Sequence, residues 1–238
     1  MTTEPRLAAT VVLVREGQRE PCEVLLCQRS ASVRAASGAM VFPGGTVDPE
    51  DHHHSTTLSS TTREHLNRLL DTPLGAALAI TAVRETLEEV GIGPVELRTF
   101  RERVRRRELT WSDAVRQSGV SWPVEDLIYF AHWITPTERA HRFDTRFFLK
   151  TGGLGDVSPD GEEIVETYWT SPRKALEEYE SGRWSMLTPT VAVLTWLAEG
   201  STVADIVVRA RRRTVTTIQP RVVRRFGEEV VEVPPPGL

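Results

Sequence analysis

The sequence has few cysteines, no long apolar run and little net charge, and each of these absences excludes a class of protein. Its 238 residues include only Cys22 and Cys27, too few for a disulfide framework and without metal-ligand partners at suitable spacing. No run of about twenty apolar residues is present, so we expect no membrane-spanning helix. The net charge of −4 offers no field for nucleic acid, and none is expected as a partner.

The composition that remains is that of a soluble enzyme. With 39% hydrophobic and 26% charged residues, the chain can bury the core of a single domain over residues 1–238. Residues 1–5 have neither the basic nor the apolar region of a secretory signal, so we expect a cytoplasmic protein. The two cysteines are then expected to be reduced.

The apolar periodicity predicts a mixture of strands and helices, and therefore an α+β fold. The expected strands are residues 7–14, 23–28, 127–133, 146–150 and 163–169. The expected helices are residues 59–71, 74–90, 172–181, 188–199 and 202–212. Beyond Thr214 the sequence alternates into a proline-rich end, which we expect to fray.

The helix predicted over residues 74–90 has an acidic side. Glu85, Glu88 and Glu89 stand at positions i, i+3 and i+4, roughly opposite an apolar stripe. Like charges at this spacing repel by about 0.2–0.5 kcal/mol per pair on an isolated helix, so the arrangement is costly without a cation. Carboxylate oxygens suit Mg²⁺ or Mn²⁺, which predicts a metal site. The alternative is an amphipathic helix with a solvated acidic face.

The surrounding residues resemble the signature box of the Nudix hydrolases, which reads G-x5-E-x7-R-E-U-x-E-E-x-G-U with U aliphatic. The second half of the box matches without departure from Arg84 through Ile92, and the first half matches at Gly45. Asp51 stands where the family has Glu, and thirty-two residues separate it from Arg84 where the family has seven. The chain therefore resembles the coenzyme A diphosphatases whose box is interrupted by an insertion.

A second pattern upstream of the box points to the same subgroup. The coenzyme A enzymes carry L-L-T-x-R-[SA]-x3-R-x3-G-x3-F-P-G-G, and this chain follows it from Leu25 to Gly45 with Cys27 in place of Thr. Two arginines in it, Arg29 and Arg34, could bind phosphate oxygens in bidentate geometry. The alternative for each arginine is a solvated surface charge.

The resemblance implies a fold as well as a site. We expect a Nudix-type α/β/α sandwich with a mixed β-sheet, to which the insertion at residues 52–77 adds a helical flap outside the core. Because long loops cost little closure entropy, this flap should be dispensable for folding. Residues 188–238 are expected to form a C-terminal helical extension and tail. The three histidines at 52–54 are expected in a solvated loop.

The implied function is metal-dependent hydrolysis of a diphosphate linkage in coenzyme A or acyl-coenzyme A, giving 3′,5′-ADP and (acyl-)4′-phosphopantetheine. The cofactor would be Mg²⁺ or Mn²⁺, and Asp51 would serve as a structural or outer-shell acid. The expected metal ligands are the carbonyl of Gly44 and the side chains of Glu85, Glu88 and Glu89; Arg84 orients them; and Arg29, Arg34 and Gly45 bind substrate.

Several alternatives remain open from the sequence. The general base could be a box glutamate or an acid from a later segment, among them Glu138, Asp144, Glu162, Glu163 and Glu166, of which we select Glu163. The substrate could be another small nucleoside diphosphate derivative, such as ADP-ribose or NADH. A Nudix-fold module that only binds a nucleotide is disfavoured, because all three repelling glutamates are retained. The sequence does not decide between a monomer and a homodimer.

Overall fold

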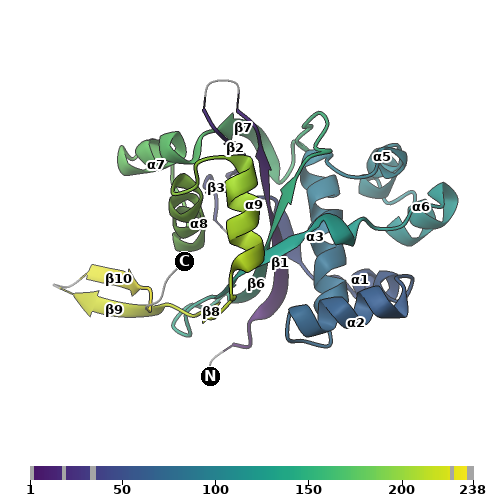
Figure 1. Cartoon of the computed structure of the whole chain (residues 1–238), viewed down its shortest axis with the longest axis horizontal. Helices are drawn as coiled ribbons and strands as arrows, with labels where there is room; N and C mark the ends of the chain where they lie inside the picture. The colour runs from purple at the N-terminus through teal and green to yellow at the C-terminus, as the bar shows by residue number, and fades with distance from the viewer. Residues whose placement is uncertain (1–2, 18–19, 33–35, 226–227, 235–238) are drawn as a thin grey trace.

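The computed structural model describes residues 3–17, 20–32, 36–225 and 228–234, and its centre is a mixed β-sheet (Figure 1). The sheet order is β3-β2-β1-β6-β5-β8, with β4 also pairing with β1 and β7 with β2. Its strands are β1 (Arg6–Arg15), β2 (Glu23–Arg29), β3 (Met40–Val41), β4 (Gly44–Thr46), β5 (Ile128–Ile134), β6 (Phe143–Thr151), β7 (Ile164–Thr170) and β8 (Thr217–Ile218).

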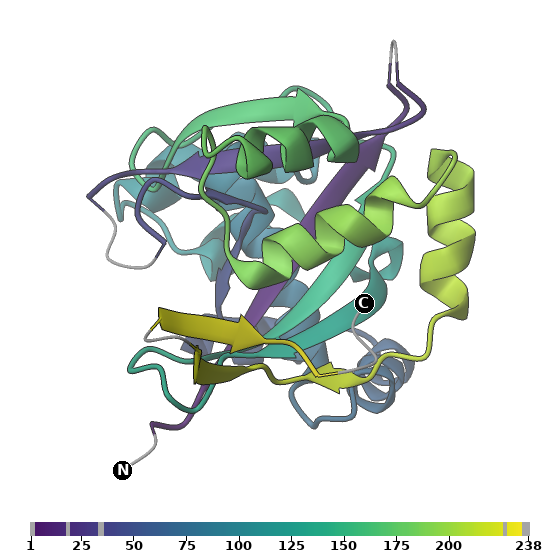
Figure 2. The same cartoon turned by 90° about the vertical axis from the view of Figure 1, so that its left-hand side faces the viewer.

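Helices cover both faces of this sheet, so the molecule is an α/β/α sandwich, as the sequence predicts (Figure 1). One face carries α1 (Pro49–Ser55), α2 (Ser60–Leu69), α3 (Gly75–Val90), α4 (Val95–Arg98), α5 (Arg101–Arg105), α6 (Trp111–Ser118) and the 3₁₀ turn η1 (Val124–Asp126). The other face carries α7 (Pro172–Glu180), α8 (Thr188–Ala198) and α9 (Val203–Arg212). Figure 2 shows α8 lying across the strands of the sheet.

The central strand β1 explains why both faces are covered. It pairs with β6 in parallel from Arg6↔Phe143 to Val14↔Thr151. Successive side chains of a strand point to opposite faces, and here Val11 and Leu13 pack in the cluster beneath α3 while Val12 and Val14 pack in the cluster beneath α8. A strand that is apolar on both sides needs a layer on each side, so the sequence of β1 requires the sandwich.

Helix α3 is the best-covered helix of the fold and carries the acidic residues. Leu78 and Ala82 pack against the sheet, whereas Ile80, Val83 and Leu87 pack against the outer helices. The helix ends at Gly91, which adopts the left-handed conformation with φ +71° that favours glycine after a helix. Because α3 is held from two sides, the carboxylates on its remaining side start from a fixed backbone.

The insertion forms helices as expected, but its position differs from the expectation. Leu66 and Leu70 are buried in the clusters around α3, and only Leu69 is exposed. Residue His54 is also buried, in α1, rather than in a solvated loop, whereas His52 and His53 are exposed. The expected position outside the core is therefore wrong, because the insertion covers the outer side of α3. That the insertion is dispensable for folding stays a prediction.

The chain after α9 also differs from the expected fraying tail. Thr217 and Ile218 form β8, which pairs in parallel with β5 through His132↔Thr217 and Trp133↔Ile218. A hairpin of β9 (Arg221–Arg225) and β10 (Glu228–Glu232) follows and projects from the body (Figures 1 and 2). Threonine, isoleucine and valine favour strands, and this propensity explains the difference. The final residues, 235–238, lie outside the described part of the chain.

Among the residues that the structure describes, no single helix is long and apolar enough to cross a membrane. Helices α8 and α9 pass such a test of length and composition only as a pair, bent by 116° at their break.

Candidate active site

The first two residues of β4, Gly44 and Gly45, lie directly against the acidic side of α3. A Cβ atom on Gly45 would stand 2.3 Å from Oε1 of Glu85, and one on Gly44 would stand 2.3 Å from the carbonyl oxygen of Ala9. The contact at Gly44 is shorter than backbone atoms allow, so only glycine fits where β4 pairs with β1, whereas the close neighbour of Gly45 is the end of a flexible side chain. The backbone N–H of Gly44 donates to Oε2 of Glu89 at 2.8 Å.

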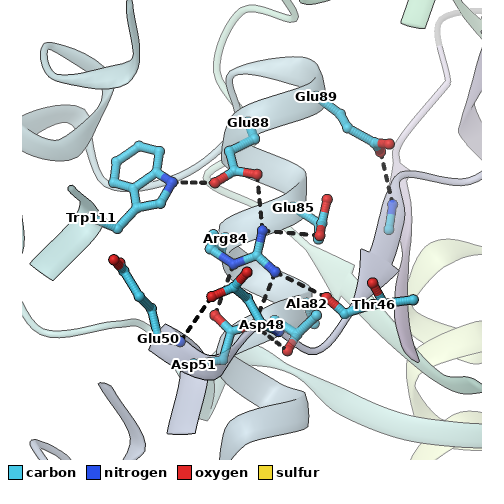
Figure 3. Close-up of polar contacts among 12 residues, drawn as sticks. Thr46, Asp48, Glu50, Asp51, Ala82, Arg84, Glu85, Glu88, Glu89 and Trp111 are labelled. Carbon is cyan, nitrogen blue, oxygen red and sulfur yellow. Dashed lines mark hydrogen bonds and ion pairs between the residues drawn. The ribbon is translucent and has the colours of Figure 1, made fainter. Parts of the chain in front are cut away.

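The guanidinium of Arg84 is anchored by Asp51, a fully buried residue of α1 (Figure 3). Arg84 Nε donates to Asp51 Oδ1 at 2.8 Å and Nη2 to Oδ2 at 2.9 Å, which is the bidentate geometry of a strong pair. The hydroxyl of Thr81 and the backbone N–H of Asp48 donate to the same carboxylate at 2.8 and 2.9 Å. Asp51 thus occupies the structural position expected of it and aims Arg84 at the glutamates.

Arg84 in turn holds two of the three helix glutamates. Its Nη1 lies 2.9 Å from both Glu85 Oε1 and Glu88 Oε2, and its Nη2 donates to the carbonyl of Thr46 at 3.2 Å (Figure 3). Burial alone would lower the pKa of Arg84, but the hydrogen bond to Asp51 and the charges of Glu85 and Glu88 raise that pKa far above its ordinary value. Arg84 is therefore a permanent cation whose donors are already engaged.

Glu88 has contacts from outside the box as well. Trp111, the first residue of α6, donates its indole N–H to Glu88 Oε1 (Figure 3). The guanidinium of Arg101 donates to the backbone carbonyl of Glu88 through Nε at 2.9 Å and Nη2 at 2.6 Å. The sequence analysis identified neither Trp111 nor Arg101 as part of the site. The capping box Thr110–Asp113 marks where α6 begins, but no local pattern gives its direction.

Glu89 faces a second arginine, Arg29 of β2. Only 4% of Glu89 is exposed, and its Oε1 lies 3.8 Å from Arg29 Nη1. Burial and the neighbouring charge of Glu85 raise the pKa of Glu89 well above its usual value. Arg29 also donates through Nη2 to Glu163 Oε2 at 3.2 Å, while its buried Nε has no hydrogen-bond partner among the described residues. Arg29 therefore retains donor capacity at the site.

The segment that carries Glu163 is fastened to the end of α3. The N–H groups of Ser158 and Asp160 donate to the carbonyls of Val90 and Glu89 at 2.9 Å each, and Asp160 Oδ1 accepts from the N–H of Glu163 at 3.1 Å. Glu163 is 58% exposed and is the later acid that reaches the site. The other later acids form contacts away from it: Glu138 is exposed, Asp144 pairs with His132 and Arg146, Glu162 with Arg105, and Glu166 with Tyr168.

The charges at this site do not balance. Five carboxylates, those of Asp51, Glu85, Glu88, Glu89 and Glu163, share the side chains of two arginines, Arg84 and Arg29. Burial is the main cause that raises the pKa of Glu85, to about 7, against the opposing effect of Arg84. The excess of buried, hard oxygen donors fits a divalent cation such as Mg²⁺ or Mn²⁺ in charge and chemistry. Within the described ranges, however, no three acidic, histidine or cysteine side chains already converge on one point.

The structure gives the positions of two of the three predicted substrate-binding residues. Arg29 and Gly45 both lie at the acidic face, as described above. Arg34 falls within residues 33–35, outside the described part of the chain. The roles assigned to all of these residues remain predictions.

Comparison with protein families decides the wider relationship. The family model described as the NUDT19 Nudix domain matches residues 52–195, more than half of the chain. The chain belongs to the Nudix hydrolase family. The match includes α1 from His52 onward, the whole of α3 and Glu163, so this Nudix domain contains the insertion as well as the acidic helix.

Individual relatives agree with this family and with a resemblance to the coenzyme A diphosphatases. An acyl-coenzyme A diphosphatase NUDT19 of Gallus gallus is 27% identical over 84% of this chain and 70% of its own length. A putative Nudix hydrolase 7 of Caenorhabditis elegans is 26% identical over 84% of this chain and 62% of its own length. A crystal structure of a Nudix hydrolase from Alicyclobacillus acidocaldarius has a TM-score of 0.75 and 26% identity, covering 91% of this chain and all of that one. This chain thus spans 62% and 70% of the lengths of the Caenorhabditis elegans and Gallus gallus relatives.

Proposed function

We propose that this Nudix protein hydrolyses a diphosphate linkage in a small nucleoside diphosphate derivative. The observation that carries the proposal is the buried acidic face of α3, whose carboxylates exceed the guanidinium groups beside them. A protein gains nothing from such a concentration of buried negative charge unless it binds a cation. The acidic face also lies against Gly44 and Gly45 of β4, whose backbone approaches Glu89 and Glu85 closely.

The residues have distinct roles in this proposal. Glu85, Glu88 and Glu89, with the carbonyl of Gly44, would hold Mg²⁺ or Mn²⁺, which when bound neutralises phosphate oxygens and lowers the pKa of a water molecule. Arg84 keeps Glu85 and Glu88 in place, and Asp51 keeps Arg84 in place. These two residues act on position, since Asp51 is fully buried and the donors of the buried Arg84 are all engaged by the protein.

The second arginine defines the side on which the substrate would bind. Arg29 offers donors beside Glu89 and Glu163, where a diphosphate oxygen could accept from its guanidinium. Glu163 is the candidate for the group that takes a proton from the attacking water, because it is exposed and adjoins Arg29. Gly45, which has no side chain, would let the substrate approach the protein backbone closely.

We further propose that the substrate is coenzyme A or acyl-coenzyme A, cleaved to 3′,5′-ADP and (acyl-)4′-phosphopantetheine. Two observations support this choice: the upstream pattern from Leu25 to Gly45, and the names of relatives such as the Gallus gallus acyl-coenzyme A diphosphatase. Cytoplasmic location remains an expectation.

Product analysis tests this function directly. Purified protein with Mg²⁺ or Mn²⁺ should be incubated with coenzyme A, an acyl-coenzyme A, ADP-ribose and NADH, and the products separated by chromatography. We expect 3′,5′-ADP from the first two substrates at the highest kcat/KM. Faster release of AMP from ADP-ribose or NADH would transfer the assignment to another nucleoside diphosphate derivative. Binding without turnover of any substrate would instead indicate a nucleotide-binding module.

A further inference from the structure

Trp111 stands apart from the other buried aromatic residues because its polar atom touches the acidic face. It is 3% exposed and begins α6, where the side chain and backbone of Thr110 and Asp113 form a reciprocal cap. The cap fixes the first turn of the helix, and with it the direction of the indole. The indole N–H donates to Glu88 Oε1, whereas Arg84 binds the opposite oxygen, Oε2 (Figure 3). Both oxygens of Glu88 are therefore oriented.

Two further aromatic rings pack in a row behind Trp111. Trp111 meets Trp122 edge to face, with ring centroids 6.0 Å apart and an interplanar angle of 69°. Trp122 meets His54 in the same manner at 5.4 Å and 70°. Such edge-to-face contacts restrict how each ring can turn.

We propose that Trp111 is a positioning residue for Glu88, and that it sets the affinity of the acidic face for a divalent cation. The proposal rests on the proposed function only in taking Glu88 as a cation ligand. A tryptophan whose role is simply to fill the core needs no polar partner, as Trp122 illustrates: its Nε1 is buried without a hydrogen-bond partner in the described structure. Groups that orient a ligand from behind typically change metal affinity or activity by 10–100-fold when removed.

The pair Trp111 and Trp122 provides a matched experiment. Trp111→Phe and Trp122→Phe each shrink one buried ring of the same edge-to-face pair, but only Trp111→Phe removes a hydrogen bond to Glu88. The affinity of the metal-free protein for Mn²⁺ should be measured by electron paramagnetic resonance, which requires no substrate. We expect Trp111→Phe to weaken Mn²⁺ binding about tenfold or more. Trp122→Phe should leave the Mn²⁺ affinity within about twofold of the wild-type value. Its melting temperature should fall by about as much as that of Trp111→Phe.

A second comparison separates positioning from a general loss of structure. If Trp111 acts through Glu88, Trp111→Phe should not weaken Mn²⁺ binding further in a Glu88→Gln background. In wild-type protein labelled with ¹⁵N-tryptophan, one indole N–H signal should also shift on addition of Mg²⁺, and the shift should be absent in Glu88→Gln. This second measurement does not depend on how well the tryptophan variants fold.

Three results would overturn the proposal: unchanged Mn²⁺ affinity in Trp111→Phe, equal losses in Trp111→Phe and Trp122→Phe, or a loss that persists in full in the Glu88→Gln background. Failure of the proposed hydrolysis would be a separate result, because the Mn²⁺ titration involves no substrate. A protein that binds Mn²⁺ through Glu88 and Trp111 but cleaves no diphosphate would support this inference and refute the catalytic one.

Discussion

The two arginines of the site have opposite surroundings. Arg84 is 6% exposed and engages Asp51, Glu85, Glu88 and the carbonyl of Thr46, so its donors are occupied by the protein itself. Arg29 touches Glu89 at 3.8 Å and the largely exposed Glu163 at 3.2 Å, and its Nε has no partner in the described structure. The difference indicates that one arginine maintains the site and the other is available to a ligand.

The two arginines should differ most in how much folding stability is lost when a partner is removed, and the loss should be largest for Asp51, the buried partner of Arg84. Asp51→Ala leaves a guanidinium buried without its main counter-charge, and breaking such a buried pair typically costs about 3–5 kcal/mol of folding stability. The expected result is a large fall in the chemical-denaturation midpoint at neutral pH. Glu163→Ala, which removes the exposed partner of Arg29, is the control and should change stability by no more than about 1 kcal/mol. Equal effects of the two variants would contradict the comparison.

The acidic face should separate activity from stability. Glu88→Gln removes one of several repelling charges but keeps the size of the side chain, so the metal-free protein should unfold at the same denaturant concentration or a slightly higher one. Its Mg²⁺-supported hydrolysis should fall by roughly 10–100-fold or more, as for disturbed metal sites generally. Steady-state kinetics and denaturant unfolding on the same preparation provide the measurement. Full turnover by Glu88→Gln with Mg²⁺ present would refute the assignment.

The acidic helix α3 and the residues packed around it also differ in how far the sequence could predict them. The helix α3, its C-terminal Gly91 and its three glutamates follow from local spacing, which fixes which side chains share a helix face. Strands β1 and β2 were predicted for a similar reason, because two-sided apolar runs indicate buried strands. The residues that contact these elements are distant in the sequence, and their positions depend on how the elements pack.

Trp111 illustrates what local patterns cannot give. It lies 23 residues after Glu88, and only the position of α6 relative to α3 brings the indole to the carboxylate. The position of the insertion was predicted wrongly for a related reason. The helical spacing of Leu66, Leu69 and Leu70 predicts a helix, but not that two of the three face the core around α3. Amphipathic helices specify a buried side without specifying what buries it.

The ligand-facing arginine should show its role in kinetics rather than in folding. If Arg29 binds a phosphate, Arg29→Ala should lower kcat/KM for coenzyme A about tenfold or more, since a charge-assisted contact contributes roughly 1.5–3 kcal/mol. Arg29→Lys, which keeps the charge but loses the planar fork, should recover only part of the rate. A larger loss on coenzyme A than on 3′-dephospho-coenzyme A would place the 3′-phosphate beside Arg29. Equal losses would assign Arg29 to the diphosphate, and no loss at all would make it a scaffold like Arg84.

The smallest expected effect concerns the pH dependence of the metal-free protein. Burial raises the folded-state pKa of Glu85 to about 7, above the unfolded value of about 4.3. A group with a raised pKa stabilises the fold fully below its unfolded value, and that contribution is lost as the pH rises through the folded value. Wild type should therefore lose stability relative to Glu85→Gln, which cannot ionise, as the pH rises from about 4.3 to about 7. Thermal melts of both proteins in chelator, at several pH values, measure this difference. Saturating Mg²⁺ should abolish it in wild type, because a bound cation favours the ionised carboxylate. A difference in melting temperature that stays constant across this range would show that Arg84 already compensates the charge of Glu85, and that the acidic face has no need of a cation at this position.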